Sequence, residues 1–142
     1  MWISHLVTQG VYGAYTLGVS GNVPFCIMKK DKPCPDVLCA LIGTRHPIVQ
    51  AGMVWCTGWE LAAEVGKAGA LGTLGAGAMY PEELKAEIQR LKAAWDGPFA
   101  VNVPLLYPDV EAHMETIAAA GVPVVFTSAG SPKKWTGFLK EA

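Results

Sequence analysis

The sequence is poor in charge. Only 16% of its 142 residues are charged, the formal net charge is −1, and no basic run is longer than Lys29-Lys30 or Lys133-Lys134. Proteins that bind nucleic acid or an anionic membrane surface concentrate basic side chains on one face. The composition therefore argues against nucleic acid or such a membrane as a partner.

The spacings that mark zinc sites are also missing. No two of the four cysteines (Cys26, Cys34, Cys39 and Cys56) form a Cys-x-x-Cys pair, and no histidine lies at ligand spacing from them, as a structural zinc site requires. Apolar residues make up 51% of the chain, which is enough for a core without disulfide bonds. We predict reduced cysteines, no metal site and a cytoplasmic protein.

The first 28 residues lack both a basic start and a long apolar run. Gly10, Gly13, Gly18 and Pro24 interrupt them, and the first basic residue is Lys29. A signal peptide begins with basic residues, and a membrane span needs about 20 mostly apolar residues. We predict neither, and we expect residues 1–36 to be a poorly ordered leader.

From Leu41 onward a regular pattern begins. Short apolar runs at 47–50, 71–74, 99–103 and 124–127 alternate with segments of helical period, and Gly or Pro closes each pair. Such alternation predicts a parallel sheet with right-handed crossovers. Either an open doubly wound sheet or part of an eight-fold barrel satisfies the pattern.

The helical segments carry start and stop signals. Thr57 and Glu60 have the spacing of a capping box, and Gly69 is placed to end that helix. Pro81 suits a first helical position, and Asp109 and Ser131-Pro132 suit the starts of two later helices. The expected buried stripes are Leu61, Val65 and Ala68; Leu84, Ile88 and Leu91; and Val110, Met114 and Ile117.

In both architectures ligands bind at the carboxyl ends of the strands. The loops there, at 51–53, 75–77, 102–104 and 128–130, are glycine-rich and almost uncharged, and Asn102 is the one amide side chain among them. Small residues let a flat ligand approach the backbone. The spacing Gly72-x-x-Gly75-x-Gly77 is not a dinucleotide fingerprint, so a Rossmann phosphate site is rejected.

Four stretches carry a resemblance to a known family. They read PIVQAGM at 47–53, AGALG at 68–72, PFAVNV at 98–103 and FTSAGSP at 126–132. In this order and at these distances they resemble the N-terminal part of the nitronate monooxygenases. FMN-dependent enoyl-acyl-carrier-protein reductases share the motifs. The resemblance implies that residues 37–142 are the N-terminal half of an FMN-binding (βα)8 TIM-type barrel, about its first four βα units with parallel strands.

The resemblance also implies site residues. Ala51, Gly52 and Met53 match the family's loop beneath the flavin ring. Asn102 matches a flavin-contacting asparagine, and the loop after the fourth strand is matched by Ser128, Ala129 and Gly130. The family's reaction passes electrons from an alkyl nitronate to FMN and on to dioxygen. The enoyl-reductase activity is the alternative, and an inactive half barrel is the non-enzyme alternative.

Two parts of the family's site have no match in this sequence: the catalytic histidine and the glycine loops that hold the FMN phosphate. His46 precedes the first strand, His113 falls within a helix and His5 lies in the leader, so we name no catalytic residue. A half barrel leaves its first and fourth strands as open edges. We therefore expect a truncated, inactive chain that self-associates through those edges.

Overall fold

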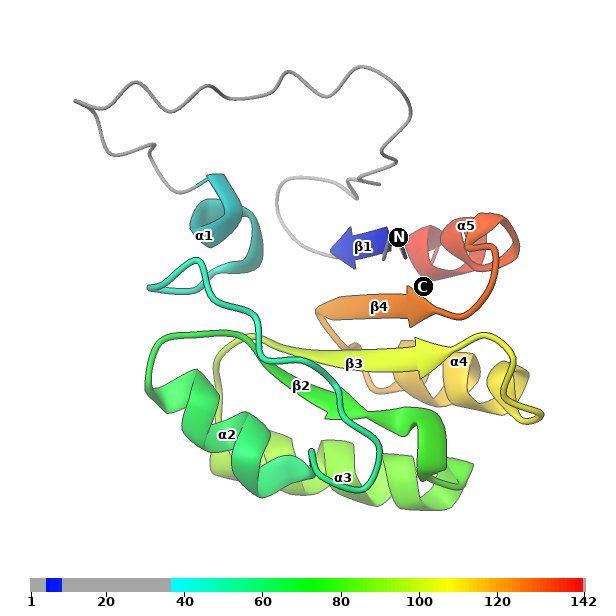
Figure 1. Ribbon diagram of the computed structural model, residues 1–142, viewed down its shortest axis with the longest axis horizontal. Coiled ribbons are helices and arrows are strands. Elements are labelled where there is room, and N and C mark those ends of the chain that lie inside the picture. The colour runs from blue at the N-terminus through cyan, green and yellow to red at the C-terminus, as the bar shows by residue number, and fades with distance from the viewer. Residues whose placement is uncertain (1–4, 9–36, 142) are drawn as a thin grey trace.

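The computed structural model describes residues 37–141 and the backbone of residues 5–8 (Figure 1). Three parallel strands alternate with helices, which confirms the α/β class and the partial barrel pattern. The other leader residues, with Cys26 and Cys34, lie outside the described residues. The strands are β1 (His5–Thr8), β2 (Gly72–Gly75), β3 (Phe99–Pro104) and β4 (Val124–Ser128); the helices are α1 (Val37–Ile42), α2 (Trp59–Lys67), the short 3₁₀ helix η1 (Ala76–Ala78), α3 (Pro81–Ala94), α4 (Val110–Ala119) and α5 (Lys133–Glu141).

The sheet has the order β1-β4-β3-β2. β2 and β3 pair in parallel with Gly72 opposite Phe99, and β3 and β4 pair in parallel with Ala100 opposite Val124. The three strands therefore end at the same edge of the sheet, and the loops that follow them meet there (Figure 1).

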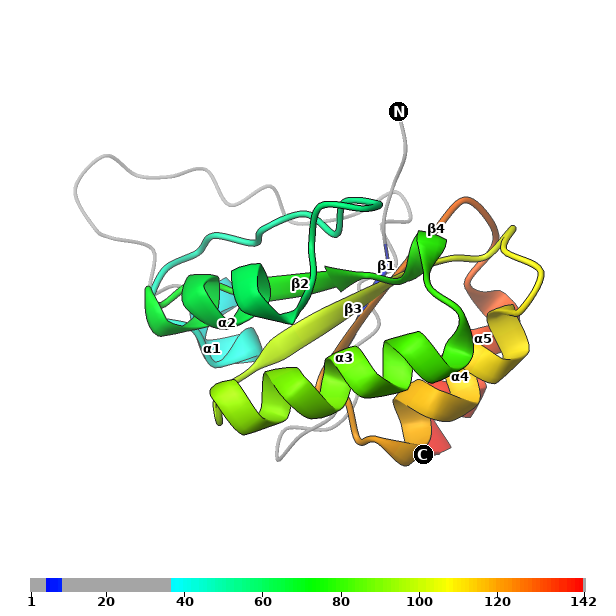
Figure 2. The same cartoon turned by 90° about the horizontal axis from the view of Figure 1, so that it is seen from below.

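Alternate side chains of the strands face two different surroundings. On one face the strands pack against the apolar sides of α2, α3, α4 and α5. Figure 2 shows these helices beside the strands. On the other face α1 lies over the amino ends of the strands and packs on Leu71, Ala100 and Val124 through Ile42. The carboxyl ends are thus the end of the sheet away from α1.

The strand predicted at residues 47–50 is not a strand in the structure. Residues 48–50 run along β2 and form a single parallel bridge, Val49 to Leu71, with hydrogen bonds from Gln50 N to Leu71 O at 2.9 Å and from Leu71 N to Ile48 O at 2.9 Å. The segment has β2 on one side and no strand among the described residues on its other side, so Ile48 and Val49 are exposed.

The fourth strand does not have the open edge that the sequence predicts. β1 pairs with it in the antiparallel direction, with His5 opposite Thr127 and Thr8 opposite Val124. Four residues of the leader therefore supply hydrogen-bonding partners for that edge. The alternating pattern that begins at Leu41 gives no sign of this pairing, because β1 belongs to none of the βα units.

The start of α2 also differs from the prediction. Gly58, not Thr57, is the N-cap residue, and no side chain of the cap residue bonds to the helix. The buried side of α2 is formed by Ala62, Ala63 and Gly66, whereas Leu61 is exposed. Small residues face the sheet because α2 lies very close to β2: a Cβ atom on Gly72 would come within 2.7 Å of Ala62 Cα.

The later helices agree well with the sequence. Pro81 is the first residue of α3 and Asp109 is the N-cap of α4, and Gly69 follows α2 with a φ of +95°. A positive φ at this position is the ordinary role of a helix-ending glycine. The predicted stripes of α3 and α4 are in the core: Leu84, Ile88, Leu91, Met114 and Ile117 are buried, and Val110 packs against them.

Candidate functional site

Four polar side chains gather at the carboxyl ends of the strands, and we call Gln50, Thr73, Asn102 and Ser128 the polar cluster. Gln50 Oε1 accepts a hydrogen bond from Thr73 N at 3.0 Å, and its amide nitrogen donates to the Ala51 carbonyl. Ser128 Oγ donates to Asn102 Oδ1 at 3.2 Å. The cluster therefore consists of two hydrogen-bonded pairs: Gln50 with the backbone of Thr73 in β2, and Asn102 in β3 with Ser128 in β4.

Gly52 joins the two pairs. A Cβ atom on Gly52 would lie 2.7 Å from Asn102 Cβ and 3.3 Å from Thr73 Cγ2, closer than side-chain atoms pack. The loop that begins at Ala51 therefore passes directly over the cluster, and only a glycine permits this approach.

Thr73 provides an unused hydrogen-bonding group. Its hydroxyl is buried and has no hydrogen-bond partner. Buried hydroxyls without a partner are uncommon, because leaving one unsatisfied costs about 1–3 kcal/mol. Thr73 Oγ1 is thus a buried hydrogen-bonding group of the cluster that no described residue satisfies.

The loop after β4 closes over the end of β3. Leu105 N donates to Ser128 O at 2.7 Å, and a Cβ atom on Gly130 would lie 2.7 Å from Leu105 Cβ. Ala129 has a φ of +53°, a conformation that residues with a side chain rarely adopt. The structure thus brings Gly52, Asn102 and Ser128 together, with Ala51 adjoining, and places Gly130 over Leu105.

The loop between Ala51 and α2 presents apolar side chains to solvent. Met53 and Val54 are exposed, and Trp55 is 88% exposed with a φ of +65°. Tyr80 and Leu106, on the next two loops at this end, are also exposed. Thr57, by contrast, is buried and bonds back to Met53.

Neither described histidine side chain belongs to the cluster. His46 is exposed, and its backbone N–H donates to Gly69 O at the amino end of β2. His113 is fully buried in α4, stacked on Tyr107 with ring centroids 5.0 Å apart. Burial lowers the pKa of His113, and its hydrogen bond to Met79 O partly opposes this. The part of the chain with described side chains therefore offers no histidine base at the cluster.

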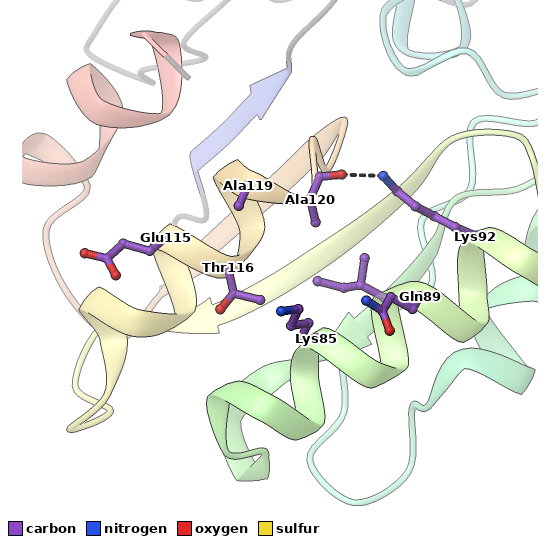
Figure 3. Close-up of a pocket in the computed structure, with 8 residues that line it drawn as sticks. Lys85, Gln89, Lys92, Glu115, Thr116, Ala119 and Ala120 are labelled. Atoms are coloured by element: carbon purple, nitrogen blue, oxygen red, sulfur yellow. Dashed lines mark hydrogen bonds between the residues drawn. The ribbon is translucent and has the colours of Figure 1, made fainter.

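Other features of the described residues lie away from the cluster. A cavity of about 590 Å³ opens between α3 and α4, lined by Lys85, Gln89, Lys92 and Glu115 among others, and Lys92 Nζ donates to Ala120 O there (Figure 3). Within the described ranges no group of three or more His, Cys, Asp or Glu residues could hold a metal ion. No described helix is long and apolar enough to cross a membrane, and Cys39 and Cys56 are free.

Sequence reasoning missed two members of the cluster. Gln50 was expected to end a strand and Thr73 to lie within one, without a binding role for either. The alternation of the strand supplies the missing signal: Leu71 and Thr73 share the face of β2 that Asn102 occupies on β3, since side chains two apart point the same way. A polar residue on that otherwise apolar face could have identified Thr73.

Comparison with known proteins settles the family. The family model described as nitronate monooxygenase matches residues 36–130. The chain belongs to the nitronate monooxygenase family. The matched range contains both pairs of the polar cluster and the loop at Gly52.

Proteins similar to this chain carry names that describe different activities. A dehydrogenase of an indene-carboxyl-CoA from Mycobacterium tuberculosis is 37% identical over 74% of this chain, and a probable nitronate monooxygenase from Staphylococcus saprophyticus is 44% identical over 52% of it. Among solved structures, FabK from Thermotoga maritima superposes with a TM-score of 0.72 and 39% identity over 73% of this chain. These relatives are similar to overlapping parts of the chain, but their names assign them different activities.

The chain spans only part of each relative. It covers 30% of the M. tuberculosis dehydrogenase, 22% of the S. saprophyticus protein and 33% of FabK. Nitronate monooxygenases are flavin-dependent. The residues at the strand ends suit the ring of such a cofactor. A flat heteroaromatic ring needs close approach to the backbone, as at Gly52, and partly exposed polar groups, as at Asn102 and Ser128.

Proposed function

We propose that the polar cluster and residues 51–53 hold the isoalloxazine ring of FMN in an oxidoreductase of nitronate monooxygenase type. The observation that carries this proposal is the close approach of Gly52 to Asn102 and Thr73, which brings the backbone of the loop and two polar side chains to one place. Asn102 can both donate and accept, as can the hydroxyls of Thr73 and Ser128. The flavin ring edge presents both kinds of group.

When bound, the flavin would take electrons from a nitronate and pass them to dioxygen. The chain's own residues, Gly52, Met53 and the polar cluster, would orient the ring and limit the access of water to it. Ala129 and Gly130 close the loop after β4 beside Ser128. We expect these contacts to supply position, and no described residue to supply the base.

An enoyl-reductase activity is the second candidate. FabK, an enoyl-acyl-carrier-protein reductase, is a structural neighbour with a TM-score of 0.72 and 39% identity over 73% of this chain. A reductase would require a nicotinamide cofactor and an acyl substrate in place of nitronate and dioxygen. The third candidate is a half barrel that binds flavin without turnover.

Ring binding can be tested without the phosphate. We expect the groups that hold the FMN phosphate to lie in the part of the relatives that this chain does not span. The full chain should then bind FMN and riboflavin with similar affinity, measured by flavin fluorescence. Much tighter binding of FMN than of riboflavin would contradict a site that contacts only the ring.

Asn102→Ala separates the proposed site from general flavin adsorption. Loss of one hydrogen-bonding amide should weaken riboflavin binding about tenfold, corresponding to about 1.4 kcal/mol. Gln89→Ala removes an exposed amide on α3, in the cavity of Figure 3, and should leave binding unchanged. Equal affinities of the Asn102→Ala variant and the original chain would overturn the proposal.

Turnover distinguishes the three candidates. The flavin-loaded chain is mixed with an alkyl nitronate in air and, separately, with NADH under anaerobic conditions. Oxygen uptake supports the monooxygenase, and bleaching of the flavin by NADH supports the reductase. If neither response is seen, the inactive half barrel is supported.

A further inference from the structure

The hydroxyl of Thr57 closes the loop that carries Gly52 and Met53. Thr57 Oγ1 accepts a hydrogen bond from Met53 N at 2.8 Å and donates one to Met53 O at 2.8 Å. Thr57 N also donates to Met53 O, at 3.1 Å. With only 2% of its surface exposed, Thr57 holds both backbone groups of Met53 in a site shielded from competing water.

The closed loop rests on the end of β2. Gly75 N donates to Thr57 O at 3.3 Å. A Cβ atom on Gly75 would lie 2.7 Å from Met53 O and 2.8 Å from Thr57 Oγ1. Gly75 is thus a close-approach glycine, and the loop cannot shift toward β2 without colliding with it.

A carboxylate from another βα unit holds the other end of this loop, where α2 begins. Glu87, in α3, accepts a hydrogen bond from Trp59 N at the start of α2, with 2.8 Å between Oε2 and the nitrogen. Its other oxygen, Oε1, accepts from Arg90 Nη1 at 2.9 Å. A negative charge at a helix N-terminus is favourable, and a hydrogen bond to an ionised acceptor is stronger than a neutral one.

The separate hydrogen bonds of Thr57 and Glu87 explain why Thr57 does not cap α2. The hydroxyl of a capping threonine would accept a hydrogen bond from a backbone N–H of the helix, and it would then not accept one from Met53 N. Here Glu87 satisfies the helix N–H, so the Thr57 hydroxyl is available to the loop. Residues 53–59 are consequently fixed at both ends, at Met53 by Thr57 and at Trp59 by Glu87.

We propose that Thr57 and Glu87 are positioning residues that hold Gly52 and Met53 at the flavin ring. This inference rests on the proposed ring site. Neither residue is in the polar cluster: each acts through the backbone of the loop, Thr57 directly on Met53 and Glu87 through the start of α2.

The test uses the full chain and compares matched variants. Thr57→Val keeps the side-chain shape and removes the hydroxyl, whereas Thr57→Ser keeps the hydroxyl. Thr136→Val is the control, because Thr136 Oγ1 donates to a backbone carbonyl, Pro132 O at 2.9 Å, in α5 away from the loop. Glu87→Ala is paired with Glu111→Ala, which removes an exposed carboxylate that bonds to Lys134.

Riboflavin affinity and Met53 amide exchange are the two readouts. Thr57→Val should weaken riboflavin binding about tenfold and speed exchange of the Met53 N–H in the flavin-free chain about tenfold, the effect of one lost hydrogen bond. Thr57→Ser should restore both. Glu87→Ala should change both in the same direction as Thr57→Val, and the two control variants should change neither.

The outcomes separate this inference from the ring site itself. Normal riboflavin affinity in Thr57→Val, or an equal loss in Thr136→Val, overturns the positioning role even though the ring site stands. If the original chain binds no flavin, the ring site fails. Met53 exchange then decides whether Thr57 fixes the loop: faster exchange in Thr57→Val, with no change in Thr136→Val, supports it, and unchanged exchange in Thr57→Val overturns it.

Discussion

The surroundings of His113 fit only the neutral form of its side chain. Its Nε2 lies 3.0 Å from Met79 O, and since a carbonyl only accepts, Nε2 carries the proton. Nδ1 is then a bare acceptor, buried and without a partner. Protonation would leave the new N–H donor without an acceptor among the described residues and would put a positive charge in a buried site. The pKa of this histidine is lowered accordingly, mainly by burial.

This arrangement predicts that acid destabilises the fold. Because the pKa of His113 is lowered by folding, the unfolded chain binds the proton more tightly. The stabilising effect is complete above the unfolded pKa of about 6.5 and is lost as pH falls from there toward the folded pKa. Urea unfolding at pH 7.5 and pH 5.0 measures this loss, and His113→Gln should reduce it. An equal loss in that variant would assign the acid effect to other groups.

At the scale of elements, the contact between α2 and β2 limits side-chain size. Gly72 faces Ala62, and a Cβ atom on Gly72 would lie 2.7 Å from Ala62 Cα and closer still to its carbonyl oxygen. These are backbone atoms, which cannot rotate away. The helix reaches the sheet only because both facing residues are small.

Gly72→Ala should therefore destabilise the chain by about 1–3 kcal/mol through overpacking. Gly137→Ala is the contrasting change, since a Cβ atom there would meet nothing within 4 Å and alanine is the better helix former by about 1 kcal/mol. Chemical unfolding of the two variants should shift in opposite directions. A Gly72→Ala midpoint equal to that of the original chain would mean that α2 can move outward freely.

The elements also show what can be read from sequence. Helical period predicted the buried stripe of α3 because large residues, Leu84, Ile88 and Leu91, form it. It failed for α2, because a helix in close contact with a glycine of the sheet buries Ala62, Ala63 and Gly66. The capping box at Thr57 failed for a related reason: the competing partners, Met53 and Glu87, are set by tertiary structure.

Within the site, the same distinction holds. The glycine loops and Asn102 stood out as a pattern, so the strand ends could be expected to form the site. The partners inside the cluster, Gln50 with Thr73 and Asn102 with Ser128, depend on register between strands. Register follows from packing of the whole sheet and is not encoded in any single segment.

At the scale of the whole molecule, β1 covers the edge of β4 and the segment at 48–50 leaves the edge of β2 only partly covered. Unpaired edges recruit strands from other molecules. The antiparallel strand His5–Thr8 therefore reduces the number of edges through which two copies can associate.

Removing residues 1–8 should increase self-association. The deletion exposes backbone groups of residues 124–127 that pair with β1, and sedimentation velocity measures the resulting shift toward dimers and larger species. Removing residues 1–4 alone retains β1 and serves as the control. A monomer fraction that is the same in both deletions would show that β1 does not protect the edge.

The hydrogen bond from Trp59 N to Glu87 has a consequence for the order in which the chain folds. Its two partners are 28 residues apart, and α2 has nine residues, too few for a stable helix in isolation. The start of α2 is completed only once α3 has docked. The loop at 51–57 therefore folds and unfolds cooperatively with α3, and local unfolding of that helix would release the loop as well.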